Sequence, residues 1–322
     1  MSLSPQLMPG ADYGELAGLR ERMGGRLFEK RLERQAGKRA KLIHQGEGVF
    51  RLERFIPFDA VVDRLLRIFR LREAMRRRFL DVRVERQEWK IPALPSAFEG
   101  FRLLQVSDLH CDLDDALTPV VENLVRSTPH DAAVVTGDFR NGMDGDHGPC
   151  LRELVKICAV MAPIRFGILG NHDFLEMVSE LEDLGLAVLL NESTSIERNG
   201  RRLWIAGIDD PHFYKTHDIA KARAEIPQNA CSILLSHSPE TFAEAAAAGF
   251  QLQLSGHTHG GQICLPGGHA LVVPCRVPRK FVAGRWSHAG LQGYTSRGTG
   301  GCGVAARWNC PPEITLHILR AA

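Results

Sequence analysis

Hydrophobic and polar positions follow two different patterns along the chain, and the change falls near residue 100. Before that point the clearest pattern is helical. Between residues 58 and 71, apolar side chains recur every three to four positions, with residues such as Asp63 and Arg67 on the opposite face. After residue 100, short apolar runs alternate with amphipathic segments, which is typical of buried strands separated by helices. The pattern therefore predicts an α/β fold with a sheet covered on both faces.

The second pattern gives expected bounds for the elements of the main domain. Strands are expected at residues 101–106, 132–136, 164–169, 187–190, 195–198, 203–208, 232–235, 251–254 and 313–319. Helices are expected at residues 114–127, 150–161, 174–184, 219–224 and 240–248. After residue 260 the helical pattern stops, so an all-β completion of the same domain is expected.

Pro92, Pro95 and Gly100 separate the two patterns and are typical of a linker. We therefore expect a basic N-terminal extension with an amphipathic helix at residues 1–95, and a main domain at residues 96–322. At 322 residues, 44% of them hydrophobic, the chain can bury a large core, which excludes a disordered protein. Residues 1–100 hold 21 Lys and Arg against 14 Asp and Glu, so the basic character belongs to the extension.

The amphipathic segment of the extension allows two interpretations. Its apolar face and the arginines at positions 76–78 fit a helix that lies on an anionic membrane surface, which predicts peripheral membrane contact through residues 58–80. Alternatively, the apolar face packs on the main domain and the arginines are solvated. A second, charged helix is expected at residues 16–42, as a solvated helix or a loosely attached extension.

Cysteine usage and the lack of targeting signals indicate the compartment. Eight cysteines are scattered without a Cys-x-x-Cys pair, so buried, reduced thiols of a cytosolic protein are expected. Residues 1–11 lack the basic and apolar regions of a secretory signal, and no run of 18 apolar residues occurs. We therefore expect a cytoplasmic protein, with or without peripheral contact to the inner face of a membrane.

Residue types that bind metals stand where five consecutive core strands are expected to end. They lie in Ser107-Asp108-Leu109-His110, Gly137-Asp138, Gly170-Asn171-His172-Asp173, Ser236-His237 and Gly256-His257-Thr258-His259. In open α/β sheets, sites are built at the carboxyl ends of the strands. A single His-x-His pair would be a weak signal, but five such strand ends in one register are not a coincidence. They predict one site that is assembled from all five.

The residue types fit a pair of divalent metal ions. Two ions about 3.5–4 Å apart need a ligand that touches both, and a carboxylate has two oxygens. Neutral histidine and asparagine fill the other positions without adding negative charge. Such a pair binds and deprotonates a water, clamps a phosphoryl group and stabilises the charge that develops during in-line attack. The constellation therefore predicts phosphoester hydrolysis by a metal-bridging hydroxide.

The five segments, in this order, resemble the signature of the calcineurin-like metallophosphoesterase family over about residues 101–322. The resemblance implies a four-layer α-β-β-α sandwich with a dinuclear metal site at the sheet edge. It implies that two divalent ions, Mn, Fe or Zn, are the cofactors. One ion would be held by Asp108, His110, Asp138 and His259. The other would be held by the bridging Asp138 together with Asn171, His237 and His257.

The same resemblance assigns two catalytic residues. It places His172 beside the scissile phosphate as a proton donor or charge stabiliser, with Asp173 as the residue that orients it. Arg140 follows the bridging carboxylate and either contacts a substrate phosphate or is a solvated loop arginine. Many relatives carry an aspartate where this chain has Asn141. This position is usually not a metal ligand, so metal binding should survive, while the residues that surround the ligands differ. Cys111 would point to the opposite side of an extended loop and is not expected to be a ligand.

Segments further along look like one bacterial branch of the family, namely Gly207-Ile208-Asp209-Asp210-Pro211, Gly260-Gly261-Gln262, Ser296-Arg297-Gly298-Thr299-Gly300 and Asn309-Cys310-Pro311-Pro312-Glu313. This branch includes phosphodiesterases and a UDP-2,3-diacylglucosamine pyrophosphatase, and its members are often membrane-linked. The resemblance implies a phosphodiester or pyrophosphate substrate, with a lipid-linked nucleotide such as UDP-2,3-diacylglucosamine as the narrower alternative.

Two other functions compete with this one. A nucleic-acid or nucleotide phosphodiesterase could use the basic N-terminal third, but its arginines lack the interleaved aromatic residues of a stacking platform, so nucleic acid is not the expected partner. A non-catalytic scaffold would have lost ligands or the adjacent histidine, whereas all seven ligands and His172 are present. The oligomeric state does not follow from the sequence.

Overall fold

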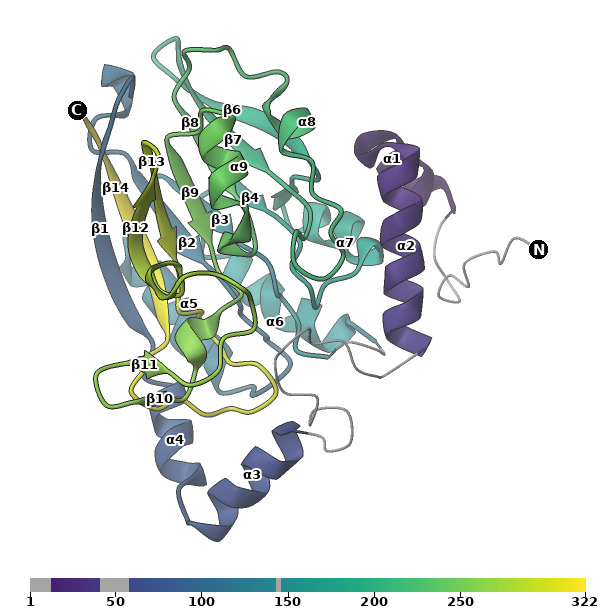
Figure 1. Cartoon of the computed structure of the whole chain (residues 1–322), viewed down its shortest axis with the longest axis vertical. Coiled ribbons are helices and arrows are strands. Elements are labelled where there is room, and N and C mark those ends of the chain that lie inside the picture. Colours follow the sequence, from purple (N-terminus) through teal and green to yellow (C-terminus); the bar gives the residue numbers. More distant parts are fainter. Residues whose placement is uncertain (1–12, 41–57, 143–145) are drawn as a thin grey trace.

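The computed structural model describes residues 13–40, 58–142 and 146–322. Two six-stranded sheets lie at its centre, and helices cover the outer side of each sheet (Figure 1). Buried apolar side chains fill the space between the two sheets. This arrangement confirms the expected α-β-β-α sandwich.

The first sheet has the strand order β1-β14-β2-β3-β4-β5. Strands β2 to β5 run parallel, whereas β14 is antiparallel to β2 and parallel to β1. The bounds are β1 Arg83–Ile91, β2 Arg102–Val106, β3 Ala132–Val135, β4 Arg165–Gly167, β5 Ala187–Val188 and β14 Glu313–Ala321. Residues 83–91, assigned to the extension from the sequence, thus form an edge strand that pairs with β14. The expected boundary between residues 95 and 96 runs through this sheet.

The second sheet has the strand order β12-β13-β9-β8-β7-β6. Its bounds are β6 Glu192–Arg198, β7 Arg201–Gly207, β8 Ser232–Leu235, β9 Leu252–Ser255, β12 Gly284–His288 and β13 Leu291–Thr295. A small hairpin, β10 Cys264–Leu265 with β11 His269–Ala270, precedes β12. The strands expected after residue 260 are therefore divided between the two sheets. Strands β12 and β13 extend the second sheet, whereas β14 belongs to the first.

Adjacent residues of a central strand face different layers. Leu103 of β2 packs between the two sheets, and Leu104 packs against the helices outside. In β8, Ile233 faces the space between the sheets and Leu234 faces the outer helices. Burial on both faces explains why these strands read as continuous apolar runs.

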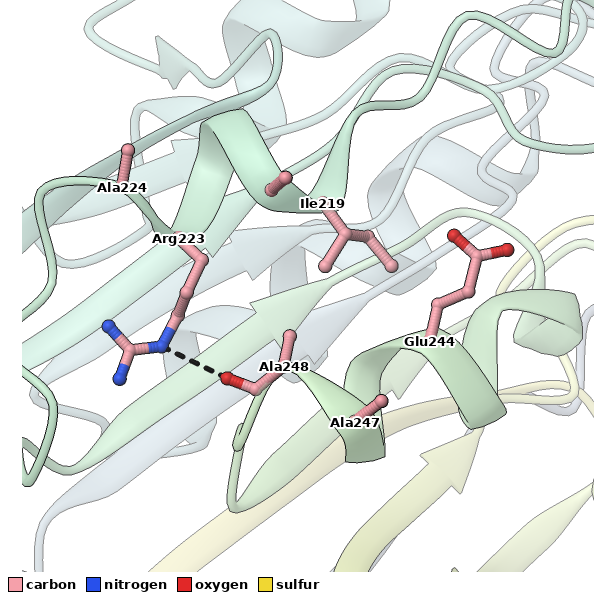
Figure 2. Close-up of a pocket in the computed structure, with 7 residues that line it drawn as sticks. Ile219, Arg223, Ala224, Glu244, Ala247 and Ala248 are labelled. Carbon is pink, nitrogen blue, oxygen red and sulfur yellow. Dashed lines mark hydrogen bonds between the residues drawn. The ribbon is translucent and has the colours of Figure 1, made fainter.

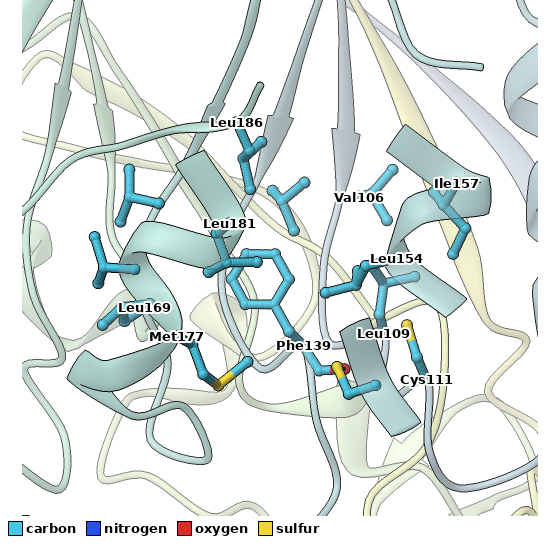
Figure 3. Packing of buried hydrophobic residues seen from close by; sticks show 14 of the residues in the cluster. Val106, Leu109, Cys111, Phe139, Leu154, Ile157, Leu169, Met177, Leu181 and Leu186 are labelled. Carbon is cyan, nitrogen blue, oxygen red and sulfur yellow. The ribbon is translucent and has the colours of Figure 1, made fainter. Parts of the chain in front are cut away.

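Helices cover both outer faces. The first sheet is covered by α5 Leu117–Ser127, α6 Gly148–Cys158 and α7 Val178–Asp183. Figure 3 shows Leu154 of α6 and Leu181 of α7 beside Phe139 in this core. The second sheet is covered by α8 Ile219–Arg223 and α9 Phe242–Ala247. Short 3-10 helices are η2 Ser96–Phe98, η3 Leu175–Met177, η4 Pro239–Thr241, η5 His259–Gly261 and η6 Arg279–Phe281.

The charged N-terminal segment packs on the sandwich. It forms α1 Tyr13–Met23 and α2 Gly25–Ala40, which lie beside α7 (Figure 1). Its apolar side chains join the outer core of the first sheet, namely Leu16, Leu19, Met23, Phe28 and Leu32. Arg31 of α2 is fully buried. The expectation of a solvated or loosely attached helix is therefore wrong for residues 16–37; the structure does not describe the side chains of residues 38–40 or any part of residues 41 and 42.

The predicted amphipathic segment forms two helices, α3 Phe58–Ile68 and α4 Arg72–Phe79, which separate at Arg70, where φ is 56°. Leu66 and Met75 are buried against the chain near Ala306. Other apolar residues of the segment are exposed, so packing on the main domain is confirmed for part of this face and membrane contact stays a prediction. The structure does not describe the side chains of residues 58–61.

An open apolar hollow lies between α8 and α9, lined among others by Ile219, Arg223, Glu244 and Ala248 (Figure 2). Arg223 closes one end by donating a hydrogen bond to the Ala248 carbonyl at 3.2 Å. None of the residues that line the hollow is an expected site residue. Among the described helices, none has the length and apolar composition needed to cross a bilayer.

Candidate metal centre

The expected ligands converge from both sheets. Strands β2, β3 and β4 of the first sheet end in the loops that carry Asp108, His110, Asp138 and Asn171. Strands β8 and β9 of the second sheet end in the loops that carry His237, His257 and His259. Because β5, β6 and β7 come between, the expectation of five consecutive strands in one register is wrong. The site spans the edge where the two sheets meet, and all seven side chains are buried.

Asp108, His110 and His259 form the first group of candidate ligands. The Nε2 atoms of His110 and His259 are 3.2 Å apart. His259 Nε2 also lies 3.5 Å from Asp108 Oδ1. Two imidazole nitrogens and a carboxylate oxygen that meet in a buried place are a donor set that suits a divalent cation.

Asp138, His237 and His257 form the second group. His237 Nε2 lies 3.3 Å from Asp138 Oδ2 and 3.0 Å from Asn171 Oδ1. Asp138 Oδ2 is also 3.7 Å from Nε2 of His110 in the first group. Asp138 therefore contacts both groups, which is the position that a bridging carboxylate needs.

Backbone carbonyls fix which imidazole nitrogens carry hydrogen. Nδ1 of His110 lies 2.8 Å from the carbonyl oxygen of Arg140, and Nδ1 of His237 lies 2.8 Å from that of Thr136. Only an N–H can bond to a carbonyl oxygen, so each Nδ1 donates and each Nε2 keeps its lone pair. Such partners orient metal-binding histidines and raise their basicity.

Unusual backbone geometry turns the ligands toward one another. Five of the seven have positive φ angles between 44° and 69°, namely Asp108, His110, Asp138, His257 and His259. Residues other than glycine rarely adopt this region, and it is concentrated at functional sites. Gly256 permits the close approach, because a Cβ there would lie 1.9 Å from Ser107 Oγ and 2.3 Å from Asp108 Oδ2.

The buried charges of the site fit bound cations. Burial raises the pKa of Asp108 to about 7, and the charge of Asp138 adds to this while that of His237 opposes it. Burial lowers the pKa of His257 and of His259 well below the ordinary histidine value, so both rings are neutral and can ligate. His257 Nε2 is buried without a hydrogen-bond partner among the described residues. Divalent cations would satisfy this nitrogen and keep the carboxylates ionised.

His172 lies beside the first group. Its ring meets that of His110 edge to face at a centroid distance of 4.9 Å. Its Nδ1 donates to the carbonyl oxygen of Asn141 at 2.8 Å, and its Nε2 lies 3.7 Å from Cys302 Sγ. The Asn141 side chain accepts a hydrogen bond from the Gly303 backbone N–H at 2.8 Å. Asn141 therefore ties His172 to the loop that carries Cys302.

The Asp173 carboxylate is bonded to the backbone of the loops that form the site. Its carboxylate accepts backbone N–H bonds from Asp138, Phe139 and Gly170 at 2.7 to 2.9 Å. Burial raises the pKa of this carboxyl to about 6, with the charge of Asp138 adding to the effect. These contacts hold the loops that carry Asp138 and Asn171, which indicates a structural role at the site.

Arg140 and Cys111 are both buried beside residues of the outer core of the first sheet. The Arg140 guanidinium lies 4.6 Å from the centre of the Phe174 ring, and the residue is 1% exposed. Burial excludes a solvated arginine, and a contact of Arg140 with substrate phosphate stays a prediction. Cys111 lies in the outer core of the first sheet, beside Leu109 in Figure 3, as expected for a residue that is not a ligand.

Comparison with known proteins identifies the family. The family model described as calcineurin-like phosphoesterase matches residues 101–261, which is half of the chain. The chain belongs to this family. The match includes the strand ends that carry all seven candidate ligands.

Curated relatives of this chain include proteins from several bacteria. The uncharacterized metallophosphoesterase YkuE of Bacillus subtilis is 30% identical over 72% of this chain and 83% of its own length. The phosphodiesterase YaeI of Escherichia coli is 26% identical over 67% of this chain and 81% of its own. The UDP-2,3-diacylglucosamine pyrophosphatase LpxG of Chlamydia trachomatis is 25% identical over 58% of this chain and 71% of its own.

A buried series of hydrogen-bonded polar side chains runs across the first sheet from Trp89 to Asp108. Trp89 Nε1 donates to His317 Nδ1 at 2.9 Å, and His317 Nε2 donates to Gln105 Oε1 at 2.9 Å. Gln105 Nε2 donates to Thr136 Oγ1, which donates to Ser107 Oγ, which donates to Asp108 Oδ2 at 3.0, 2.7 and 2.6 Å. This series of hydrogen bonds orients the Asp108 carboxylate.

The sequence analysis missed two further residues at the candidate metal centre. The His212 ring lies 4.3 Å from that of His257, and His212 Nδ1 is 2.7 Å from Glu240 Oε2. Arg307 is fully buried and donates to the carbonyl oxygen of His259 at 2.8 Å. His212 directly follows Asp209-Asp210-Pro211, so that segment was a usable signal. No sequence pattern predicts the burial of Arg307, because an isolated arginine in an irregular segment is usually solvated.

Proposed function

We propose that the protein is a hydrolase that cleaves a phosphodiester or pyrophosphate bond with two divalent ions, Mn, Fe or Zn, as cofactors. One observation supports this most directly: two adjacent buried His and Asp groups are joined by Asp138, whose Oδ2 lies near histidines of both. When bound, such a metal pair polarises a phosphoryl group and lowers the pKa of water. Membership of a phosphoesterase family supports the reaction class.

The residues of the chain have distinct roles in this proposal. Asp108, His110 and His259 would hold one ion, Asn171, His237 and His257 would hold the other, and Asp138 is placed to serve both. Because Nδ1 of His172 is bonded to the Asn141 carbonyl, the proton that His172 moves is on Nε2. Nε2 with a proton donates to the leaving-group oxygen, and Nε2 without one accepts a proton. Asp173 acts indirectly, by holding the backbone of the ligand loops.

The substrate proposal has a general and a narrow form. Similarity to YaeI, a phosphodiesterase, and to LpxG, a UDP-2,3-diacylglucosamine pyrophosphatase, supports a diester or a pyrophosphate as the substrate of this chain. The narrow form is a lipid-linked nucleotide, used by a cytoplasmic protein at the inner face of a bacterial membrane. Hydrolysis assays on bis-p-nitrophenyl phosphate, p-nitrophenyl phosphate, a lipid-linked nucleotide diphosphate and a cyclic nucleotide separate these forms. Activity on the monoester alone would contradict the proposal.

Two substitutions test the site itself. Asp138→Asn should remove most bound metal and most activity, because the Asp138 carboxylate lies near histidines of both groups. His172→Ala should retain the metal and slow hydrolysis by about 10²-fold, as loss of an acid–base group does. Metal content by mass spectrometry and initial rates on bis-p-nitrophenyl phosphate are the measurements.

Asp183→Asn, on the exposed side of α7, serves as the control for the loss of a carboxylate. It should retain both metal and activity. Two metals and full turnover in Asp138→Asn would refute the bridging role. Equal loss of metal in His172→Ala would show that His172 is a ligand and not an acid–base group.

A further inference from the structure

Helix α3 and the turn after it expose large apolar side chains. Ile68 and Phe69 are 63% and 66% exposed, and Leu65 and Leu71 are 47% and 38% exposed. Neighbouring Leu66 is 8% exposed because it packs toward Ala306. The exposed residues are thus the outer part of a face whose inner part is anchored to the sandwich. A group of exposed large apolar side chains of this kind marks an interaction surface.

The β10–β11 hairpin adds a second exposed apolar group beside the first. Leu265, Leu271 and Val272 are 49%, 62% and 58% exposed. Ile263, just before β10, packs in the same small cluster as Leu66. Figure 1 shows the hairpin next to α4. We name these seven exposed residues the apolar edge, namely Leu65, Ile68, Phe69, Leu71, Leu265, Leu271 and Val272.

Positive charge predominates in the two segments that carry the apolar edge. Residues 62–80 contain seven arginines against two acidic residues. Residues 245–312, which include the hairpin, contain six Lys and Arg and no Asp or Glu. Arg64 and Arg70 on the α3 side are exposed, as are Arg276 and Arg279 after the hairpin. The surface therefore combines apolar side chains with a positive rim.

The apolar edge is connected to the metal centre through Arg307. The Arg307 backbone N–H donates to the Met75 carbonyl of α4 at 3.3 Å, and its guanidinium donates to the His259 carbonyl at 2.8 Å. Arg78 of α4 lies over the Trp308 ring at 4.1 Å. Both contacts fix α4 to the segment beside the candidate ligand His259. A molecule held at the apolar edge would thus lie on the side of the protein where this ligand loop is anchored.

We propose that the apolar edge docks onto an anionic phospholipid bilayer. Apolar side chains that enter the interface and arginines that meet lipid phosphates are the two components of peripheral membrane binding, and both are present here. The charge favours a bilayer over a second copy of this chain, because two copies joined at the edge would bring their arginine rims together. Binding does not depend on the proposed activity, and it adds a surface at which the protein could meet a lipid-linked phosphoester.

Vesicle sedimentation with the full-length protein tests this inference. Vesicles of phosphatidylcholine with about 30% phosphatidylglycerol are compared with pure phosphatidylcholine vesicles, at low and high salt. Ile68→Ser with Phe69→Ser should weaken binding to the anionic vesicles at least about 10-fold, because two inserted side chains are lost. Leu271→Ser with Val272→Ser should weaken it in the same direction. Binding of the wild type should fall with salt and on neutral vesicles.

The matched control is Val155→Ser with Ile164→Ser, which removes two apolar residues that are 49% and 40% exposed elsewhere. This control should bind like the wild type. Equal binding of the Ile68/Phe69 variant and the wild type, or no binding of the wild type, would overturn the inference. A change of mass in light scattering caused by the Ile68/Phe69 substitutions without vesicles would identify a second copy as the occupant and also overturn it. Rates on soluble bis-p-nitrophenyl phosphate should be unchanged in both variants, so failure of the activity and failure of docking are separate results.

Discussion

His317 shows how one buried residue can couple the fold to pH. It lies between Trp89 and Gln105, and it accepts from the first and donates to the second. Both nitrogens are satisfied only in the neutral ring, because a proton on Nδ1 would face the Trp89 N–H. Burial, with the charge of Arg285 adding to it, lowers the pKa of His317 to about 3. An unfolded histidine binds a proton near pH 6.5.

The sign of the pH effect follows from these two values. Between pH 6.5 and 3 the unfolded chain carries a proton on residue 317 that the folded chain lacks, so this contribution to stability is complete above pH 6.5 and is lost as the pH falls. From pH 7 to pH 5 the loss is about 2 kcal/mol. We predict that urea unfolding will show a smaller loss over this range for His317→Gln, whose amide can bond to both neighbours without titrating. An identical pH dependence in both proteins would contradict the prediction.

At the residue scale, the sequence predicted positions better than contacts. The seven candidate ligands were found because each follows an apolar run and most stand beside a glycine, which is a local pattern. The contacts of Arg140 and Asp173 were not found, because they depend on which loop folds against which. Arg140 faces Phe174, and Asp173 accepts N–H groups from the loop after β3. No spacing along the chain specifies either contact.

At the scale of elements, helix α2 brings a charged side chain into the vicinity of the metal centre. Arg31 donates to the carbonyl oxygen of Asp173 at 3.0 Å, and its Nε lies 3.3 Å from Asp209 Oδ2. Its guanidinium also stacks on Tyr214, 3.2 Å from the ring centre. It therefore connects the His172–Asp173 loop with the 209–214 loop, which carries His212. Helix α2 acts as a brace between two loops of the site.

We predict that Arg31→Lys will lower kcat by about 10-fold, while KM and metal content change little, as expected for a residue that supports the site from behind. Lysine keeps the charge beside Asp209 but lacks the planar guanidinium group that reaches Asp173 and stacks on Tyr214. Steady-state kinetics on bis-p-nitrophenyl phosphate and metal analysis are the measurements.

Arg26→Lys, at an exposed position of the same helix, should leave kcat unchanged. If Arg31→Lys changed KM alone, or if both variants behaved alike, the bracing role of α2 would be excluded.

Strands and helices of the main domain could be predicted because the spacing of apolar residues is a local pattern in the sequence. Strand β8 was predicted with its observed bounds. Strand β1 was not predicted, because only its last residues, Trp89 and Ile91, are buried deeply and the rest reads as charged. Its partner β14 lies more than 200 residues away. Helix α2 was misjudged for a similar reason: its polar residues Arg31 and Gln35 are buried by contacts with distant loops.

At the scale of the whole molecule, the candidate metal centre joins the two halves of the sandwich. Asp108, His110, Asp138 and Asn171 belong to the first sheet, and His237, His257 and His259 to the second. Ions that bind here would hold the two sheets together and would bind the folded state alone.

We predict that removal of metal with a chelator will lower the melting temperature by about 5 °C or more, since a ligand at 100 times its dissociation constant adds about 2.7 kcal/mol. Differential scanning fluorimetry, with Mn or Zn added back after dialysis, is the measurement. Asp138→Asn should show a much smaller shift. An unchanged melting temperature in the wild type would mean that no stabilising ion binds.

The position of β14 between β1 and β2 has a consequence for biosynthesis. The chain makes β1 and β2 early, yet the strand that separates them, Glu313–Ala321, is made more than 200 residues later. Until then both strands have an unpaired edge toward the gap, and such edges invite pairing with other chains. The helices and the parallel strands β2 to β5 can assemble as the ribosome proceeds, but the first sheet closes last. Nascent chains should therefore depend on chaperones until β14 has emerged.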